Sequence, residues 1–117
     1  MELRVLMDEL DKLYEHKPIR MRDGYSLIPG FSSYRGYYEQ LAVDYTSALT
    51  DDFTVRDFKN LLERALDQGT MEGYRGGTFS IDCDTEVVLA NYGCSGGFFI
   101  AEFIEREDDV YMAVGDI

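Results

Sequence analysis

The sequence predicts an α+β protein in which two amphipathic helices pack on one face of an antiparallel β-sheet with a C-terminal hairpin or meander. Two segments repeat apolar residues at helical spacing, and several short segments are rich in β-branched and aromatic residues. Glycine, proline and charged turns separate these segments. At 117 residues, the chain is expected to form a single domain spanning residues 1–117.

The first helix is predicted over residues 3–15, and Pro18 ends it. Its apolar stripe consists of Leu3, Leu6, Leu10, Leu13 and Tyr14. The segment 17–36 then predicts a long loop with at most short strands, because it is rich in proline and glycine. This loop is the most basic part of the chain, with Arg20, Arg22 and Arg35.

A strand is predicted over residues 37–45 from the alternation of its apolar residues, and the second helix follows it. Thr54 is the expected N-cap, Asp57 stands at the third helical position, and Gly69 supplies the stop. The apolar stripe of this helix consists of Val55, Phe58, Leu61, Leu62, Ala65 and Leu66.

The C-terminal part predicts strands over residues 86–92 and 98–104, joined by the five-residue loop 93–97. A charged turn over 105–109 leads into a last strand over 110–114. Aromatic side chains fall on both faces of the second of these strands, so burial of one face in a homodimer is compatible with the pattern. These residues are Phe98, Phe99 and Phe103.

The chain has 23 acidic against 11 basic residues, a formal net charge of −12. Such a surface repels phosphate backbones, so nucleic-acid binding is disfavoured and a partner protein with a basic face is favoured. No apolar run is long enough for a membrane span, and the N-terminus lacks the pattern of a secretory signal. We therefore expect no membrane association and a cytoplasmic protein.

Catalytic patterns are incomplete in this sequence. Residues 93–97 match G-x-S-x-G, but a predicted strand rather than a helix follows Ser95. The only histidine, His16, would have to serve as the base for Ser95 or for Cys94. We therefore expect a glycine-rich hairpin turn and no enzymatic activity.

No metal site or cofactor is expected either. The two cysteines, Cys83 and Cys94, lack a C-x-x-C partner set, so we expect reduced, partly buried thiols. Asp82, Asp84 and Glu86 alternate along the chain, which favours a solvated strand edge over a cation site because the residues of a calcium loop do not follow.

The tripeptide Tyr-Arg-Gly occurs twice, at residues 34–36 and 74–76, and provides the candidate ligand site. Arginine beside an aromatic ring and a glycine suits a nucleotide-like anion, which the ring stacks on and the guanidinium pairs with. The alternative to a ligand site is a structural role, in which the tyrosines pack at the sheet margin and each arginine pairs with a carboxylate. The candidate residues are Tyr34, Arg35, Gly36, Tyr74, Arg75, Gly76, Gly77 and Asn91, with Arg20 and Arg22 as further candidates.

The acidic residues concentrate on the predicted helices, where they either mimic the phosphates of DNA or merely keep the helices soluble. They are Asp8, Glu9, Asp11 and Glu15 in the first helix, and Asp51, Asp52, Asp57, Glu63 and Asp67 around the second.

Four blocks over about residues 30–97 resemble small uncharacterised proteins encoded by tailed bacteriophages. The blocks are residues 33–43, 54–57, 73–79 and 87–93, with S-x-R-G-x-Y, G-Y-x-G-G and N-Y-G as their core patterns. The resemblance implies an accessory protein that works inside an infected bacterium, and it carries no catalytic residues.

Two functions are expected from these observations. The first is a non-enzymatic phage protein that neutralises a host defence factor through its acidic surface, as a DNA mimic in one form. The alternative is a small-ligand binder that sequesters a nucleotide-like anion through the Arg/Tyr/Gly loops.

Overall fold

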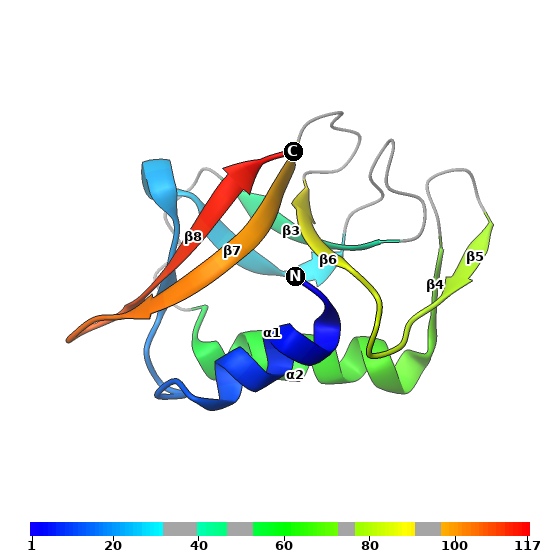
Figure 1. The fold of residues 1–117 in the computed structure, drawn as a ribbon, viewed down its shortest axis with the longest axis horizontal. Helices are drawn as coiled ribbons and strands as arrows, with labels where there is room; N and C mark the ends of the chain where they lie inside the picture. The colour runs from blue at the N-terminus through cyan, green and yellow to red at the C-terminus, as the bar shows by residue number, and fades with distance from the viewer. Residues whose placement is uncertain (32–39, 47–52, 73–76, 91–96) are drawn as a thin grey trace.

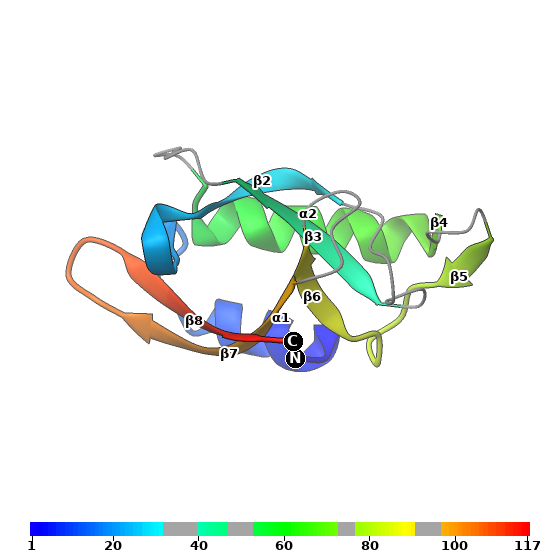
Figure 2. The same cartoon turned by 90° about the horizontal axis from the view of Figure 1, so that it is seen from above.

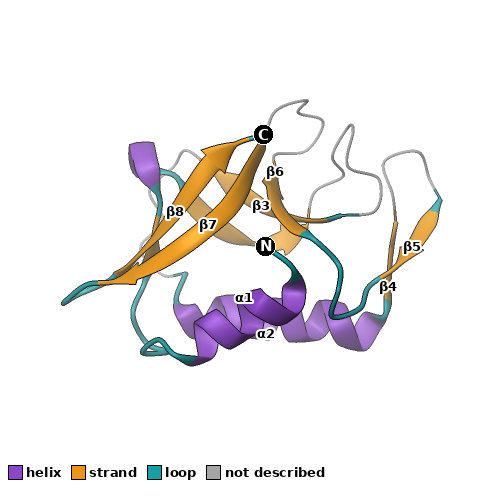
Figure 3. Ribbon diagram, viewed as in Figure 1, coloured by secondary structure: helices purple, strands orange, loops and turns teal. Residues whose placement is uncertain are grey.

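The computed structural model describes residues 1–31, 40–46, 53–72, 77–90 and 97–117 (Figure 1). These ranges contain two α-helices, a short 3-10 helix and eight strands (Figure 3). The helices are α1 (Leu3–Asp11), η1 (Arg22–Gly24) and α2 (Val55–Gln68). The strands are β1 (Ile19–Arg20), β2 (Ser26–Phe31), β3 (Leu41–Thr46), β4 (Thr70–Glu72), β5 (Thr78–Ser80), β6 (Val87–Ala90), β7 (Gly97–Glu105) and β8 (Val110–Asp116).

The predicted α+β class is confirmed, and the sheet is mixed and mostly antiparallel where a purely antiparallel sheet was predicted. Six strands form one sheet in the order β1-β8-β7-β6-β3-β2, in which β1 runs parallel to β8 and β3 runs parallel to β6. The physical reason is the connection between β3 and β6, which contains α2, because a long crossover permits parallel pairing where a tight hairpin does not. Strands β4 and β5 form a separate two-stranded sheet.

The six-stranded sheet is strongly curved. Figure 2 shows β2 and β3 on one side of the molecule and β7 and β8 on the other, with β6 between them. The outermost strands of the sheet, β1 and β2, contact each other. Curvature of this kind encloses apolar side chains and leaves little of the sheet edges free for pairing with other chains.

The helix α1 is shorter than predicted. It ends at Asp11 rather than at Glu15, and Tyr14 is 59% exposed instead of joining the apolar stripe. Its first N–H groups are bound by another part of the chain: Leu3 N–H donates to the Thr85 carbonyl at 2.8 Å, and Arg4 N–H donates to the Cys83 carbonyl at 2.9 Å. The N-terminus of α1 therefore has no free amides at these positions for an anion.

The predicted second helix is confirmed at both ends. The Thr54 side chain accepts a hydrogen bond from Asp57 N–H, and Asp57 Oδ2 accepts one from Thr54 N–H, which is a capping box. Gly69 ends the helix in a left-handed conformation, with φ of 76°. Val55 and Arg56 donate their N–H groups to carbonyls of residues 15–17, so this N-terminus is also occupied.

The core lies between the curved sheet and the helices. Apolar residues that are at least nine-tenths buried come from both helices and from most strands. Among the largest fully buried side chains are Phe58, Leu3, Leu6, Leu10, Leu27, Leu41, Leu62, Leu89 and Met112. Among the described residues, no helix combines the length and apolar character needed to cross a membrane.

The segment 17–36 contains more structure than predicted. Its longest strand, β2, has six residues and includes Pro29 and Gly30. The pairing of β2 with β3 is irregular between Leu27 and Phe31. Proline has no N–H to donate to a regular ladder, so it is tolerated where the pairing is irregular. The predicted strand 37–45 is found from Leu41 onwards, and its first three residues lie outside the described ranges.

Candidate functional site

The predicted ligand site falls almost entirely outside the described residues. Tyr34, Arg35, Gly36, Tyr74, Arg75, Gly76 and Asn91 all belong to the ranges that the structure does not describe. Gly77 is described and lies exposed directly before β5. Whether these residues form one pocket therefore stays a sequence-based prediction.

A groove that the sequence analysis missed lies between β2 and α2. It has a volume of about 610 Å³. Its described lining residues are Leu27, Ile28 and Pro29 of β2, Phe53 before α2, and Asp57, Asn60 and Arg64 of α2. Figure 2 shows the two elements running side by side, and contacts between them are present. One side of the groove is therefore apolar and the other polar.

The apolar side of this β2–α2 groove is anchored in the core. Leu27 and Phe53 are buried, whereas Ile28 is half-buried and Pro29 is exposed. The ring of Phe53 packs against that of Phe58, with 5.9 Å between ring centroids, and the Phe53 carbonyl accepts a hydrogen bond from Ile19 N–H at 2.9 Å. This side is held in place by the tertiary fold.

The polar side of the groove is one stripe of α2. Asp57, Asn60 and Arg64 are spaced by three and four residues, which places them on the same helical face, and all three are exposed. Asp57 is partly engaged, because its Oδ2 accepts a hydrogen bond of 3.0 Å from Thr54 N–H. Arg64 forms no ion pair with any residue of the described ranges.

A neighbouring stripe of α2, which contains Lys59 and Glu63, lies beside α1. Lys59 Nζ lies 2.8 Å from Asp11 Oδ1 across the contact between the two helices. The hydrogen bond to Asp11 is the main reason that the pKa of Lys59 is raised, and the charges of Asp11, Glu15 and Glu63 act in the same direction. Several carboxylates thus surround one cation.

We define the helical acidic surface by the acidic residues Asp8, Asp11, Glu15, Glu63 and Asp67, all of which are exposed. Of the other predicted acidic positions, Glu9 is half-buried and its Oε1 pairs with Lys12 at 3.3 Å. Asp57 lines the β2–α2 groove instead. Asp51 and Asp52 lie outside the described ranges. Of the acidic residues predicted on the helices, Asp57 thus belongs to the groove, and the helical acidic surface borders the groove where Asp67 follows Arg64.

Arg22, a further candidate for the ligand site, contacts an aromatic ring and a carboxylate of the protein itself. Its guanidinium carbon lies 4.7 Å from the centroid of the Phe98 ring, and its Nη2 lies 2.6 Å from Asp116 Oδ1. Tyr25 and Tyr45 stack beside Phe98, with 5.5 Å between their own ring centroids. For Arg22, these contacts match the alternative in which an arginine pairs with a local carboxylate.

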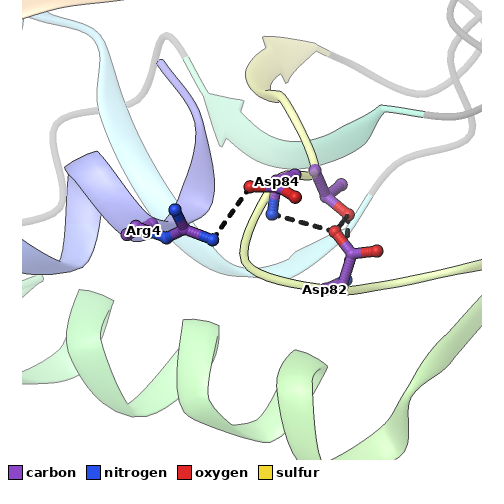
Figure 4. A network of polar contacts seen from close by, with 4 residues as sticks. Arg4, Asp82 and Asp84 are labelled. Atoms are coloured by element: carbon purple, nitrogen blue, oxygen red, sulfur yellow. Dashed lines mark hydrogen bonds and ion pairs between the residues drawn. The ribbon is translucent and has the colours of Figure 1, made fainter.

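The alternating acids 82–86 form a turn that supports α1 (Figure 4). Asp82 Oδ1 accepts a hydrogen bond of 2.8 Å from Asp84 N–H, and Asp84 Oδ1 pairs with Arg4 at 3.0 Å. Among the described residues, no group of three or more histidine, cysteine or acidic side chains is placed to hold a metal ion. Cys83 in this turn is exposed, so the prediction of a partly buried thiol is wrong for it. Cys83 lies in the turn between β5 and β6, and it is the backbone carbonyl of this residue that contacts α1, by accepting a hydrogen bond from Arg4 N–H.

The nucleophile candidates are not tested by the described residues. His16 is exposed, and its ring lies edge-on to that of Tyr14 with 5.5 Å between centroids. Its Nε2 lies 3.5 Å from Glu15 Oε1. Cys94 and Ser95 fall outside the described ranges, so their distance from His16 stays open.

The charged turn between β7 and β8 is held by ion pairs. Arg106 binds Asp109 through two nitrogens, at 2.5 and 2.9 Å, and this contact lowers the pKa of Asp109. Glu105 accepts a hydrogen bond from Tyr14 N–H and pairs with Lys17, which together lower the pKa of Glu105. This turn is therefore tied to the segment after α1.

Compared with protein-family models, with curated proteins and with solved structures, the chain shows no significant match. The functional conclusions below therefore depend on the residues and surfaces just described.

Proposed function

We propose that the protein is a non-enzymatic binding protein that engages the basic face of a partner protein through its helical acidic surface. In the setting that the phage resemblance implies, the partner is a host defence factor in the cytoplasm of the infected bacterium. The observation that carries the proposal is the cluster of Asp11, Glu15 and Glu63 around Lys59, where one cation faces several carboxylates.

The placement of the helices supports this proposal. We infer that both helices pack on one face of the sheet, with the C-terminal strands β6, β7 and β8 as a meander, which leaves the outer helix faces open to a partner. Contacts of α2 with α1 and with β2, and the antiparallel pairing of β6 with β7 and of β7 with β8, support this inference.

Charge would govern both the rate and the salt dependence of such a complex. Complementary potentials accelerate encounter, and salt weakens contacts between exposed charges. In the DNA-mimic form, the carboxylates take the place of phosphates, so duplex DNA and this protein would compete for one site on the partner.

A pair of charge-matched variants tests the proposal. The test variant carries Asp8→Asn, Glu63→Gln and Asp67→Asn, three exposed acids of the helical acidic surface without ion pairs in the described ranges. The control carries Glu102→Gln, Glu107→Gln and Asp108→Asn, which are exposed residues of β7 and the following turn. Each variant loses three negative charges, so any difference between them reports position rather than net charge.

The measurement is capture of partners from bacterial lysate at low salt, identified by mass spectrometry and repeated with purified partner. We expect a partner that binds the native protein and the control, releases at high salt, and binds the test variant at least about tenfold more weakly. Equal binding by both variants would contradict the proposal. Competition by duplex DNA for the same partner distinguishes the DNA mimic from other basic-face binding.

A further inference from the structure

We propose that the β2–α2 groove binds a small amphipathic carboxylate, with its apolar body on the β2 side and its carboxylate on Arg64. The groove borders the helical acidic surface, because Asp67 lies three residues after Arg64 in α2, whereas Lys59 lies on a neighbouring stripe. The proposal does not rest on the proposed function, because its test follows a small carboxylate and not a partner protein.

The dimensions and composition of the groove fit a small molecule. A volume of about 610 Å³ lies within the range of about 300–1,000 Å³ that is typical of ligand pockets. Four of its seven described lining residues are apolar, and the remaining three are polar and adjacent on one helix stripe. Such pockets combine an apolar surface that supplies affinity with a few polar groups that fix orientation.

Arg64 determines the charge of the ligand. Several cations of the described ranges pair with carboxylates, as Arg22 does with Asp116 and Arg106 with Asp109, whereas Arg56 and Arg64 of α2 form no such pair there. Arg64 has no such pair within those ranges, although the chain carries a net charge of −12. Its planar guanidinium matches a carboxylate in a two-point contact, and the apolar wall beside it reduces competition from water.

Asp57 and Asn60 restrict which anions fit. Asp57 lies two helical turns before Arg64 on the same stripe, so a second negative charge at that end of the ligand would be repelled. Asn60 stands between them and offers both a hydrogen-bond donor and an acceptor. A ligand with one carboxylate and an uncharged or donating far end satisfies all three side chains.

The apolar side is preformed, which lowers the cost of binding. Leu27 pairs with Tyr45 in the sheet, and Pro29 restricts the backbone of the irregular stretch that follows. Phe53 is fixed through its ring contact with Phe58. Because these groups are already ordered, little conformational entropy is lost when a ligand binds.

The test uses three defined carboxylates: 4-phenylbutyrate, octanoate and indole-3-acetate. Binding is followed by amide chemical-shift changes in NMR spectra of the full chain. For fragments of this size we expect dissociation constants of about 1 mM or tighter, with the largest shifts at Ile28, Asn60 and Arg64. The neutral amide of 4-phenylbutyrate and inorganic phosphate serve as probes that each lack one half of the proposed ligand.

The variants Arg64→Gln and Arg56→Gln separate the site from general charge. Both residues are exposed on α2, but only Arg64 lines the groove. We expect Arg64→Gln to weaken 4-phenylbutyrate binding at least about tenfold and Arg56→Gln to leave it unchanged. The variant Ile28→Asp, on the apolar side, should abolish binding, and its circular dichroism spectrum checks the fold.

Several results would overturn the proposal. Equal binding of the acid and its amide would remove the role of Arg64, and tight binding of phosphate would make the groove a simple anion site. Shifts confined to other elements, or no shift with any of the three carboxylates at about 10 mM, would show that the groove does not bind this class of ligand.

Discussion

Lys59 Nζ lies 2.8 Å from Asp11 Oδ1, so an ion pair joins the middle of α2 to the last residue of α1. Lys59 is one-quarter exposed and Asp11 more than half exposed, which places the pair at the surface of the helix contact. Pairs of this kind contribute little to stability on their own. The importance of this pair is that it places a cation among the carboxylates of the helical acidic surface.

The variant Asp11→Asn is expected to lower the free energy of unfolding by less than about 1 kcal/mol. The pair raises the pKa of Lys59, so its stabilisation is present below the ordinary value of 10.5 and is lost as pH rises through the raised pKa. Urea unfolding at neutral pH and at alkaline pH measures this. Asp8→Asn is the control, because Asp8 is exposed and forms no ion pair with the described part of the chain. An equal effect of both variants would contradict the prediction.

The capping box of α2 gives a second prediction. Thr54→Ala removes the side-chain oxygen that accepts Asp57 N–H at 3.2 Å, and we expect a loss of about 1 kcal/mol in unfolding free energy. Glu63→Ala, on an exposed face of the same helix, is expected to change it by less than about 0.5 kcal/mol. Urea midpoints compare the two variants, and a smaller effect at Thr54 than at Glu63 would count against the cap.

Acid should destabilise the fold through the turn between β7 and β8. The folded-state pKa values of Glu105 and Asp109 are lowered, so both carboxylates contribute stability above their unfolded values of 4.5 and 3.8. This contribution is lost as pH falls through the lowered folded values, because the unfolded chain takes up protons first. Melting temperatures measured from neutral pH to about pH 2 should fall less steeply in Glu105→Gln than in the native protein.

Close packing across β7 and β8 provides the fourth prediction. Gly115 lies opposite Phe99, and a Cβ at Gly115 would lie only 2.5 Å from Phe99 Cε1. Phe99 is 43% exposed, so the ring would swing outward, and we expect Gly115→Ala to cost about 1 kcal/mol. Gly77→Ala is the control, because nothing lies within 4 Å of its added Cβ. In a double-mutant cycle, Phe99→Ala should remove most of the cost at Gly115.

Local sequence signals predicted the helices better than the sheet. The helix α2 was predictable because its cap, apolar stripe and stop glycine all lie within sixteen residues of each other. The end of α1 was not predictable from the sequence. The carbonyls of Lys17 and Glu15 lie outside the helix and accept hydrogen bonds from Val55 N–H and Arg56 N–H, respectively. That contact depends on the tertiary fold and leaves no local pattern.

The sheet and the groove depend on contacts between distant segments. The strand β2 was missed because Pro29 and Gly30 are typical of loops, whereas its stability comes from pairing with β3. The groove combines residues 27–29 with residues 53–64, and no pattern in the sequence brings them together. The stripe of Asp57, Asn60 and Arg64 was visible in the sequence, but on its own it indicates only an exposed helix face.

The parallel pairing of β1 with β8 has a consequence for how the chain folds during synthesis. Ile19 pairs with Val110, and the Pro18 carbonyl accepts a hydrogen bond from Val110 N–H at 2.9 Å. A ribosome releases the early segment long before its partner strand exists. The sheet can be completed only after β8 has left the exit tunnel, so the nascent chain must carry an unpaired β1 until then.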